Sequence, residues 1–143
     1  MLKKILAALA AVALVSACGD DPPPPPPSQA TVPAVRNFLV FFDFDRSNLT
    51  PRAQAVVKEA ADVAKAGRYA RITCTGHTDT AGSNSYNLAL SLRRANTVKD
   101  ALVREGVAAN TISVVGRGKE QLLVQTRDGV REPQNRRVEI VMQ

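Results

Sequence analysis

Histidine, cysteine and tryptophan are scarce in this 143-residue chain. It has one histidine, two cysteines and no tryptophan, and aromatic residues make up 4% of it. Zinc sites use three or four ligands of the cysteine, histidine and carboxylate type, so the single histidine, His77, argues against a metal site. The chain also lacks the G-x-S-x-G turn on which many acyl-transfer enzymes carry their nucleophile. The sequence therefore predicts neither a metal centre nor a catalytic nucleophile.

The N-terminal apolar run is too short to span a bilayer comfortably. It extends from Ile5 to Val15, follows two lysines and precedes small residues, which is the pattern of a secretory signal. The segment Val15-Ser16-Ala17-Cys18 resembles a bacterial lipobox. We therefore expect a lipoprotein signal peptide over residues 1–17, with Cys18 lipidated as the first mature residue. Cys74 would then have no disulfide partner, and its alternation with Ile72 predicts a buried strand residue.

Strong positive charge is also missing. The formal net charge is +6 and falls to +4 once Lys3 and Lys4 leave with the signal peptide. The phenylalanines gather in one apolar run instead of alternating with arginines on a surface. Together with export from the cytoplasm, this argues against nucleic acid as a partner.

Proline is concentrated in one place. Residues 18–36 contain six consecutive prolines, which favour an extended polyproline II spacer and exclude a packed core. We interpret this segment as a tether between the lipidated cysteine and a folded domain over residues 37–143.

Strands and helices alternate along residues 37–143. A buried phenylalanine-rich strand begins at Asn37 and ends at Asp43 or Asp45, and Thr50 and Pro51 start an amphipathic helix that Gly67 ends. The remaining expected elements are a strand over 70–76, a helix over about 85–105, a strand in TISVVGRG and a strand in RRVEIVM. This order predicts an α/β sandwich, with helices packed on a mixed sheet.

The segment GHTDTAGSNSYN, residues 76–87, forms the loop that leads into the second helix. Asn87, Ser91 and Arg94 form a polar stripe at the border of that helix's apolar face, and Arg93 points into solvent. The apolar face itself is expected to contain Leu88, Leu92, Ala95, Val98 and Leu102. Because Asp79 lies in the loop that enters the helix, we expect Asp79 and Arg94 to meet at one cleft. One fixed anion beside one fixed cation suits a zwitterionic ligand.

Two catalytic alternatives use residues of the same region. His77 and Asp79 could belong to a Ser-His-Asp triad, but the sequence lacks the G-x-S-x-G turn and nothing else in it marks a nucleophile. Asp43 and Asp45 could act as the carboxylate pair of a glycosidase, but a simpler interpretation is that one binds a cationic group or caps the loop. For His77 we favour a structural hydrogen bond that fixes the loop.

The segments FFDFDRSNL, TGHTDTAGSNSYNLALSLRRANTVKDAL, GRGKEQ and QNRRVEI occur in this order within residues 37–143. Together they resemble the OmpA-like peptidoglycan-binding domain family. The resemblance implies the OmpA-like fold, with a βαβαβ-type mixed sheet, and non-covalent binding of meso-diaminopimelate in cell-wall peptidoglycan. It implies no cofactor and no enzymatic activity.

The resemblance also assigns roles to residues. Asp79 pairs with the ligand ammonium, Arg94 binds the carboxylate on the same carbon, and Asn87 adds hydrogen bonds. Thr78 and Asp43 line the pocket. An arginine of the NRR segment also contributes, for which we choose Arg137, with Arg136 as the alternative. The glycines of the loop, Gly76 and Gly82, are expected to let its backbone approach the stem peptide.

The expected protein is therefore an outer-membrane lipoprotein. Acyl chains on Cys18 would hold it in the outer membrane at the periplasmic face, and the domain would tether that membrane to peptidoglycan and support envelope integrity. Gly19 after the lipidated cysteine favours sorting to the outer membrane. Two alternatives remain: a periplasmic hub with a Tol-type protein partner, and a cell-wall hydrolase. The sequence motifs GHTDTAG and LSLRRA are closer to the general OmpA-like pattern than to the pattern of peptidoglycan-associated lipoprotein, which argues against the Tol-type partner.

Overall fold

The structure is a computed structural model that describes residues 19, 22–27, 31 and 33–143. The expected signal peptide and Cys18 lie outside the described residues. Pro22–Pro27 are exposed and form neither helix nor strand. Residues 31–143 form one compact unit. Its first strand begins at Arg36, one residue before the expected start of the domain.

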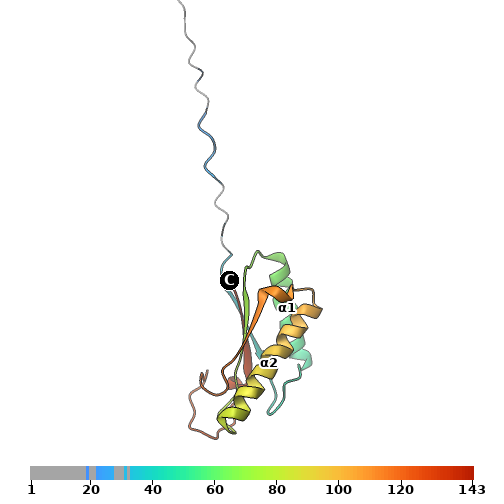
Figure 1. Cartoon of the computed structure of the whole chain (residues 1–143), viewed down its shortest axis with the longest axis vertical. Coiled ribbons are helices and arrows are strands. Elements are labelled where there is room, and N and C mark those ends of the chain that lie inside the picture. Colours follow the sequence, from blue (N-terminus) through green and yellow to red (C-terminus); the bar gives the residue numbers. More distant parts are fainter. Residues whose placement is uncertain (1–18, 20–21, 28–30, 32) are drawn as a thin grey trace, which may run out of the picture. The chain divides into compact units, whose positions relative to one another are not determined.

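A four-stranded mixed sheet forms one layer of this unit, and two helices cover one of its faces (Figure 1). The strand order is β1-β4-β2-β3, with β4 antiparallel to both of its neighbours and β2 parallel to β3. The elements are β1 (Arg36–Phe41), α1 (Pro51–Ala66), β2 (Ile72–Gly76), α2 (Asn84–Arg104), η1 (Ala109–Thr111), β3 (Ile112–Gly116), η2 (Pro133–Asn135) and β4 (Arg137–Met142), η denoting a 3₁₀ helix. This arrangement confirms the predicted α/β sandwich.

Helix α1 begins as the sequence indicates. The Thr50 side chain accepts a hydrogen bond from the Ala53 amide at 3.1 Å, and Pro51 is the first helical residue. Ala53, Val57, Ala60 and Ala61 are buried in the core, on the predicted apolar stripe. Gly67 ends the helix in an extended conformation.

Helix α2 is rotated relative to the orientation that its leucines predict. Leu88 and Leu92 were expected in the core, but they are 50% and 45% exposed. The buried face consists of Asn87, Leu90, Ser91, Arg94, Ala95, Val98, Ala101 and Leu102. Only the C-terminal half of α2 packs on the apolar core, because its N-terminal half covers a polar region at the end of the sheet. The polar stripe is therefore inside the protein, not at its border.

Close packing between β2 and α2 requires a glycine. A Cβ atom on Gly76 would lie 1.9 Å from the carbonyl oxygen of Ser91. The side chain of Ser91 also accepts a hydrogen bond from the Gly118 amide at 2.8 Å and donates one to the Leu88 carbonyl. Gly76 thus admits the α2 backbone, a packing role that the sequence did not indicate.

The polar segment between β3 and β4 is held by side-chain hydrogen bonds instead of a sheet. Asn135 bonds both the amide and the carbonyl of Val124, at 2.8 and 2.9 Å. The Thr80 hydroxyl bonds the Arg127 carbonyl at 2.8 Å and accepts from the Val130 amide at 2.9 Å. These contacts fix the segment against the loop between β2 and α2.

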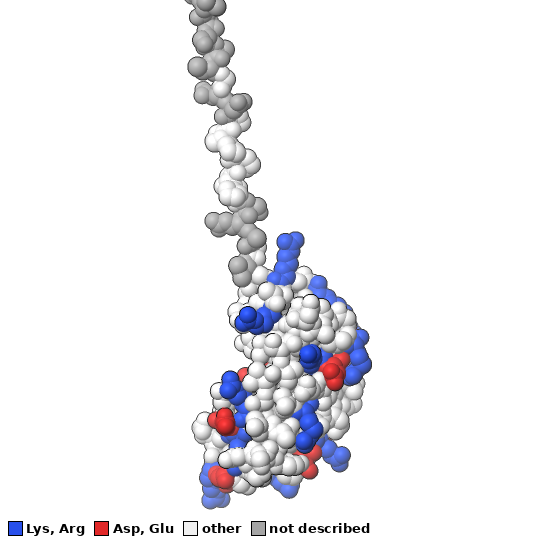
Figure 2. All heavy atoms as spheres, in the orientation of Figure 1, with Lys and Arg blue, Asp and Glu red and all other residues white. Residues whose placement is uncertain are grey.

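Basic and acidic side chains both occur on the face of the domain in Figure 2, with the basic ones in the majority. Among the described residues, no helix has both the length and the apolar character that crossing a membrane requires.

Cys74 is fully buried on β2, as expected, and burial raises the pKa of its thiol to about 12. Its thiol is therefore protonated and unreactive at neutral pH.

Candidate functional site

A small polar cavity lies at the end of the sheet where β1 and β2 run into their loops. Its walls come from the β1–α1 loop, the β2–α2 loop, the first turns of α2 and the residue before β4. The lining residues are Phe44, Asp45, Thr78, Asp79, Ala81, Tyr86, Asn87, Leu90, Arg94 and Arg136. We call this the polar cavity.

Arg94 forms the inner wall of the polar cavity and is 0% exposed. Its guanidinium donates to three main-chain carbonyls: Nε to Arg46 at 2.8 Å, Nη1 to His77 at 3.0 Å and Nη2 to Asp43 at 3.1 Å. These carbonyls belong to the two loops that enclose the cavity. Arg94 therefore joins the β1–α1 loop to the end of β2, a structural role that the sequence did not indicate.

Arg94 keeps its charge and part of its donor capacity. A guanidinium has five N–H groups, and the three hydrogen bonds leave two of them for another partner. Burial, followed by the neighbouring charge of Arg136, lowers the pKa of Arg94 to about 10. The side chain is thus a fixed cation at neutral pH.

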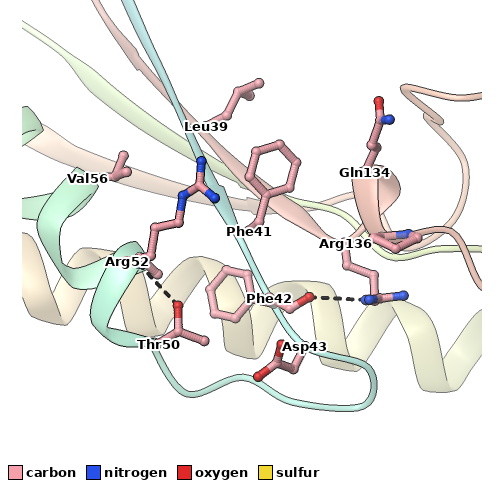
Figure 3. A pocket seen from close by; sticks show the side chains of 11 residues that line it. Leu39, Phe41, Phe42, Asp43, Thr50, Arg52, Val56, Gln134 and Arg136 are labelled. Carbon is pink, nitrogen blue, oxygen red and sulfur yellow. Dashed lines mark hydrogen bonds between the residues drawn. The ribbon is translucent and has the colours of Figure 1, made fainter.

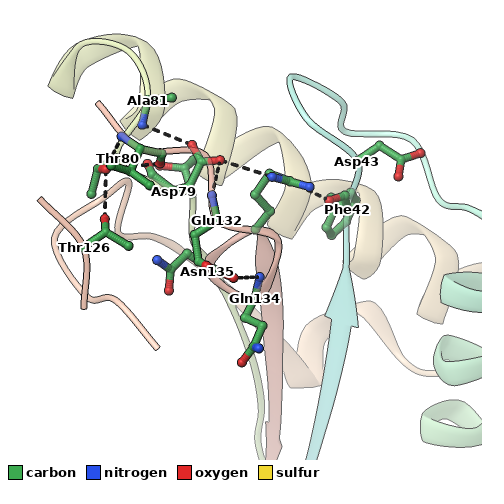
Figure 4. Close-up of polar contacts among 12 residues, drawn as sticks. Phe42, Asp43, Asp79, Thr80, Ala81, Thr126, Glu132, Gln134 and Asn135 are labelled. Atoms are coloured by element: carbon green, nitrogen blue, oxygen red, sulfur yellow. Dashed lines mark hydrogen bonds and ion pairs between the residues drawn. The ribbon is translucent and has the colours of Figure 1, made fainter. Parts of the chain in front are cut away.

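Asp79 lies at the start of the β2–α2 loop and is also buried (Figure 4). Its Oδ1 accepts from the Ala81 amide at 3.2 Å, and its Oδ2 accepts from the Glu132 amide and from Arg136 Nη1, both at 3.3 Å. Asp79 and Arg94 line the same cavity, as predicted, but they form no direct ion pair with each other. The ion-pair partner of Asp79 in the structure is Arg136.

Asn87 and Thr78 complete the inner part of the cavity. Asn87 Nδ2 donates to the Ala81 carbonyl at 2.8 Å, which orients the amide so that Oδ1 is its remaining acceptor. The Thr78 hydroxyl donates to the Asp79 carbonyl at 2.9 Å. Both side chains are buried and both line the cavity, where the sequence placed them.

The outer part of the cavity contains Asp45, which the sequence indicates only as one member of a carboxylate pair. β1 ends at Phe41, so Asp43 and Asp45 both lie beyond the strand. Asp45 lines the polar cavity, and its carboxylate accepts a hydrogen bond from the Tyr86 hydroxyl. This bond raises the pKa of Tyr86. Asp43 is exposed and lines a neighbouring groove, not the polar cavity.

The two arginines of the NRR segment lie differently with respect to the polar cavity. Arg136 lines the polar cavity, pairs with Asp79 and donates from Nε to the Phe42 carbonyl at 3.1 Å. Arg137 is the first residue of β4, where Nη2 pairs with Glu139 at 2.8 Å, and it is not among the cavity residues.

His77 does not make the expected side-chain hydrogen bond. Within the described part of the chain neither ring nitrogen has a hydrogen-bond partner, and Nε2 lies 3.8 Å from Glu139. Its main chain fixes the loop instead, since the amide donates to the Arg137 carbonyl and the carbonyl accepts from Arg94. Burial, followed by the charge of Arg137, lowers the pKa of His77 to about 4, so the ring is neutral at pH 7.

The polar cavity therefore presents two carboxylates, Asp45 and Asp79, and two guanidinium groups, Arg94 and Arg136. Paired fixed charges of both signs complement a ligand that carries an ammonium and a carboxylate on one carbon.

Within residues 19, 22–27, 31 and 33–143, no group of three or more histidine, cysteine, aspartate or glutamate side chains could hold a metal ion.

Comparison with known proteins identifies the family. The family model described as "OmpA family" matches residues 41–136, which is more than half of the chain and includes every residue that lines the polar cavity. The chain belongs to the OmpA family.

Relatives of the chain are named as proteins of the bacterial envelope. It is 45% identical over 119 residues to an "Outer membrane protein" of Gluconacetobacter diazotrophicus, covering 79% of this chain and 31% of that protein. It is 40% identical over 111 residues to a "Peptidoglycan-associated lipoprotein" of Legionella pneumophila, covering 78% of this chain and 63% of that protein. The alignments thus span less than two thirds of the length of either relative.

A solved structure supports the fold independently. The crystal structure of the peptidoglycan-associated lipoprotein from Burkholderia pseudomallei superposes with a TM-score of 0.68 at 35% sequence identity. The match covers 74% of this chain and 90% of that one. This similarity confirms the OmpA-like fold expected from the sequence.

Proposed function

We propose that the domain binds peptidoglycan without covalent chemistry, by holding the free amino-acid head group of meso-diaminopimelate in the polar cavity. The main support is the juxtaposition of Asp79 and Arg94 in one buried site. Family membership and a relative named for its association with peptidoglycan favour the same ligand class.

Asp79, Asn87 and Arg94 each have hydrogen-bonding groups left for this ligand. Asp79 Oδ1 accepts one hydrogen bond in the structure, and a carboxylate oxygen has two acceptor sites, so one remains for the ligand ammonium. Asn87 Oδ1 supplies a second acceptor for the same ammonium. The ligand carboxylate would accept from the two unused N–H groups of Arg94. Binding in this low-dielectric site strengthens each of these contacts relative to water.

Entry of the head group requires the rim to move. The cavity volume is about 20 Å³, enough for little more than one water molecule. Its rim consists of Phe44, Asp45 and Tyr86, all exposed. Separating the Tyr86 hydroxyl from Asp45 would widen the opening without disturbing the contacts of Arg94.

The N-terminal segment extends the proposal to the envelope. The lipobox-like residues before Cys18 and the six prolines after it suit a lipid-anchored protein on a short spacer, which would tether the outer membrane to the wall from its periplasmic side. The relatives from G. diazotrophicus and L. pneumophila are named as an outer membrane protein and a lipoprotein, in agreement with this location. Detection of diacylglycerol on Cys18 by mass spectrometry would test the anchor.

Similarity to two peptidoglycan-associated lipoproteins also favours a second role, as a hub for a Tol-type protein partner. Cross-linking in intact envelopes tests this role, because a hub would capture a Tol protein whether or not peptidoglycan has been digested.

Co-sedimentation with purified sacculi tests the peptidoglycan proposal. Wild-type protein should sediment with diaminopimelate-type sacculi and stay in solution with lysine-type sacculi. Asp79→Asn keeps an oxygen acceptor for Ala81 but removes the charge, so this variant should lose most sedimentation. Asp100→Asn, an exposed acid on α2 outside the cavity, is the matched control and should sediment normally. Equal sedimentation of Asp79→Asn and wild type would reject the site, and release of soluble muropeptides by pure protein would indicate a hydrolase.

A further inference from the structure

A second, larger concavity adjoins the polar cavity along the edge of the sheet (Figure 3). It has a volume of about 450 Å³ and lies between β1, the start of α1 and the segment around η2. We call it the edge groove. Its lining residues are Leu39, Phe41, Phe42, Asp43, Thr50, Arg52, Ala53, Val56, Pro133, Gln134 and Arg136.

The edge groove combines an apolar floor with the guanidinium group of Arg52. Leu39 and Phe41 alternate on the edge strand β1 and are 39% and 43% exposed, and Val56 lies on the α1 side. Within the described part of the chain, the Arg52 side chain forms neither a hydrogen bond nor an ion pair with an acid. The groove thus offers a guanidinium to an incoming carboxylate, beside surface that suits small apolar groups.

Arg136 marks where the groove and the polar cavity adjoin, since it is the one residue that lines both. Its Nη1 bonds Asp79 at the cavity, and its Nε bonds the Phe42 carbonyl at the groove. Figure 3 shows Arg136 and Arg52 on opposite sides of the two phenylalanines Phe41 and Phe42. A ligand whose head group occupies the cavity therefore leaves it beside the groove.

We propose that the edge groove binds the part of the stem peptide to which diaminopimelate is attached, and that Arg52 pairs with the free carboxylate of its γ-linked glutamate. This inference rests on the proposed function. In the stem L-Ala-γ-D-Glu-meso-diaminopimelate the glutamate is linked through its γ-carboxyl, so its α-carboxylate stays free and ionised at neutral pH. The alanine methyl group is of a size and polarity that suit the floor around Leu39 and Phe41. Arg52 thereby extends recognition from one amino acid to the peptide that carries it.

Calorimetric titration with two ligands separates the groove from the cavity. Free meso-diaminopimelate reaches only the polar cavity, whereas the tripeptide L-Ala-γ-D-Glu-meso-diaminopimelate reaches both sites. Arg52→Ala should weaken tripeptide binding about tenfold and leave the affinity for free diaminopimelate unchanged, because one charge-assisted contact at a partly exposed site is lost. Arg52→Lys should recover part of the loss.

The variants are chosen so that folding does not confound the result. Arg52 is exposed and stands near the N-terminus of α1, where a positive charge is unfavourable, so its removal should not destabilise the domain. Arg68→Ala is the matched control: it removes an exposed arginine that lines neither site, and it should bind both ligands as wild type does.

Each other outcome contradicts the inference. Wild-type affinity of Arg52→Ala for the tripeptide overturns it, and an equal loss for both ligands shows that Arg52 acts on the cavity or the fold. A concentration-dependent dimer that Phe41→Asp abolishes, with tripeptide binding retained, assigns the groove to a second copy of the chain. If wild-type protein binds neither ligand, the proposed function itself fails.

Discussion

Replacing Arg94 with alanine should destabilise the domain strongly, because this one side chain holds two loops together. The substitution removes the donors to the carbonyls of Asp43, Arg46 and His77. Hydrogen bonds to a charged group contribute about 1.5–3 kcal/mol each, which sets an upper limit of about 9 kcal/mol for the three. The desolvation of the buried guanidinium offsets part of this contribution, so we expect a loss of about 3–5 kcal/mol.

Urea unfolding followed by circular dichroism measures this loss. A domain of this size is typically stable by about 5–15 kcal/mol, so Arg94→Ala should show a large shift of its midpoint. Arg93→Ala is the matched control, since Arg93 is the next residue on α2 and is exposed, and it should change the free energy of unfolding by less than about 0.5 kcal/mol. An Arg94→Ala variant within about 1 kcal/mol of wild type would refute the reasoning.

This structural role affects how binding is tested. Loss of peptidoglycan binding in Arg94→Ala would report the state of the loops as well as the loss of a ligand contact. Asp79→Asn is the cleaner variant, because it keeps the size of the side chain and an acceptor oxygen.

Two further predictions concern buried residues beside the site. His77, with its pKa lowered from the ordinary value of 6.5 to about 4, binds no proton in the folded state over this range, whereas the unfolded chain does. The free energy of unfolding should therefore fall as pH falls from about 6.5 to 4, by at most about 3 kcal/mol more than in a His77→Phe variant. Thermal unfolding of both proteins across this pH range measures the difference, and parallel pH profiles would exclude a contribution from His77. Gly76→Ala should cost about 2 kcal/mol or more, because its Cβ would lie 1.9 Å from the Ser91 carbonyl oxygen. Gly129→Ala is the control: its Cβ would meet open space, so only the φ of 79° opposes it, and it should cost about 1 kcal/mol. Equal urea midpoints for Gly76→Ala and Gly129→Ala would contradict the packing argument.

The elements that the sequence predicts well are those with local signals. Thr50 and Pro51 mark the first helical turn of α1, and the spacing of its alanines and valines identifies the buried face. Alternation around Cys74 identifies β2 as a strand with one buried face. In these cases the interactions that fix the structure lie within a few residues, or depend only on the period of apolar side chains.

The orientation of α2 could not be predicted in this way. Its leucines suggest a core face through Leu88 and Leu92, but the helix buries Arg94 and Ser91 instead. Burial of these polar groups is compensated by carbonyls and amides of loops that are distant in sequence, such as Asp43 and Gly118. A hydrophobicity pattern contains no information about such partners.

The sequence predicts the part of the site that depends on local connections. Asp79 and Arg94 share a cavity because a short loop connects β2 to α2, which the sequence indicates. Asp45 and Arg136 also line it, but their positions depend on where β1 ends and where β4 begins, and strand boundaries are the least reliable part of a sequence-based assignment. A shift of one strand position moves a side chain to the opposite face, so the sequence alone does not decide which arginine of the NRR segment lines the cavity.

The central claim is that fixed charges of both signs in the polar cavity recognise an ammonium and a carboxylate on one carbon. Calorimetric titration of wild-type protein with L-Ala-γ-D-Glu-meso-diaminopimelate and with L-Ala-γ-D-Glu-L-Lys tests it most directly. The lysine peptide has the same side-chain amine but lacks the carboxylate beside it. The account predicts binding of the diaminopimelate peptide at least about a hundredfold tighter, because Arg94 is left without its anionic partner in the lysine complex. Equal affinities for the two peptides would contradict it.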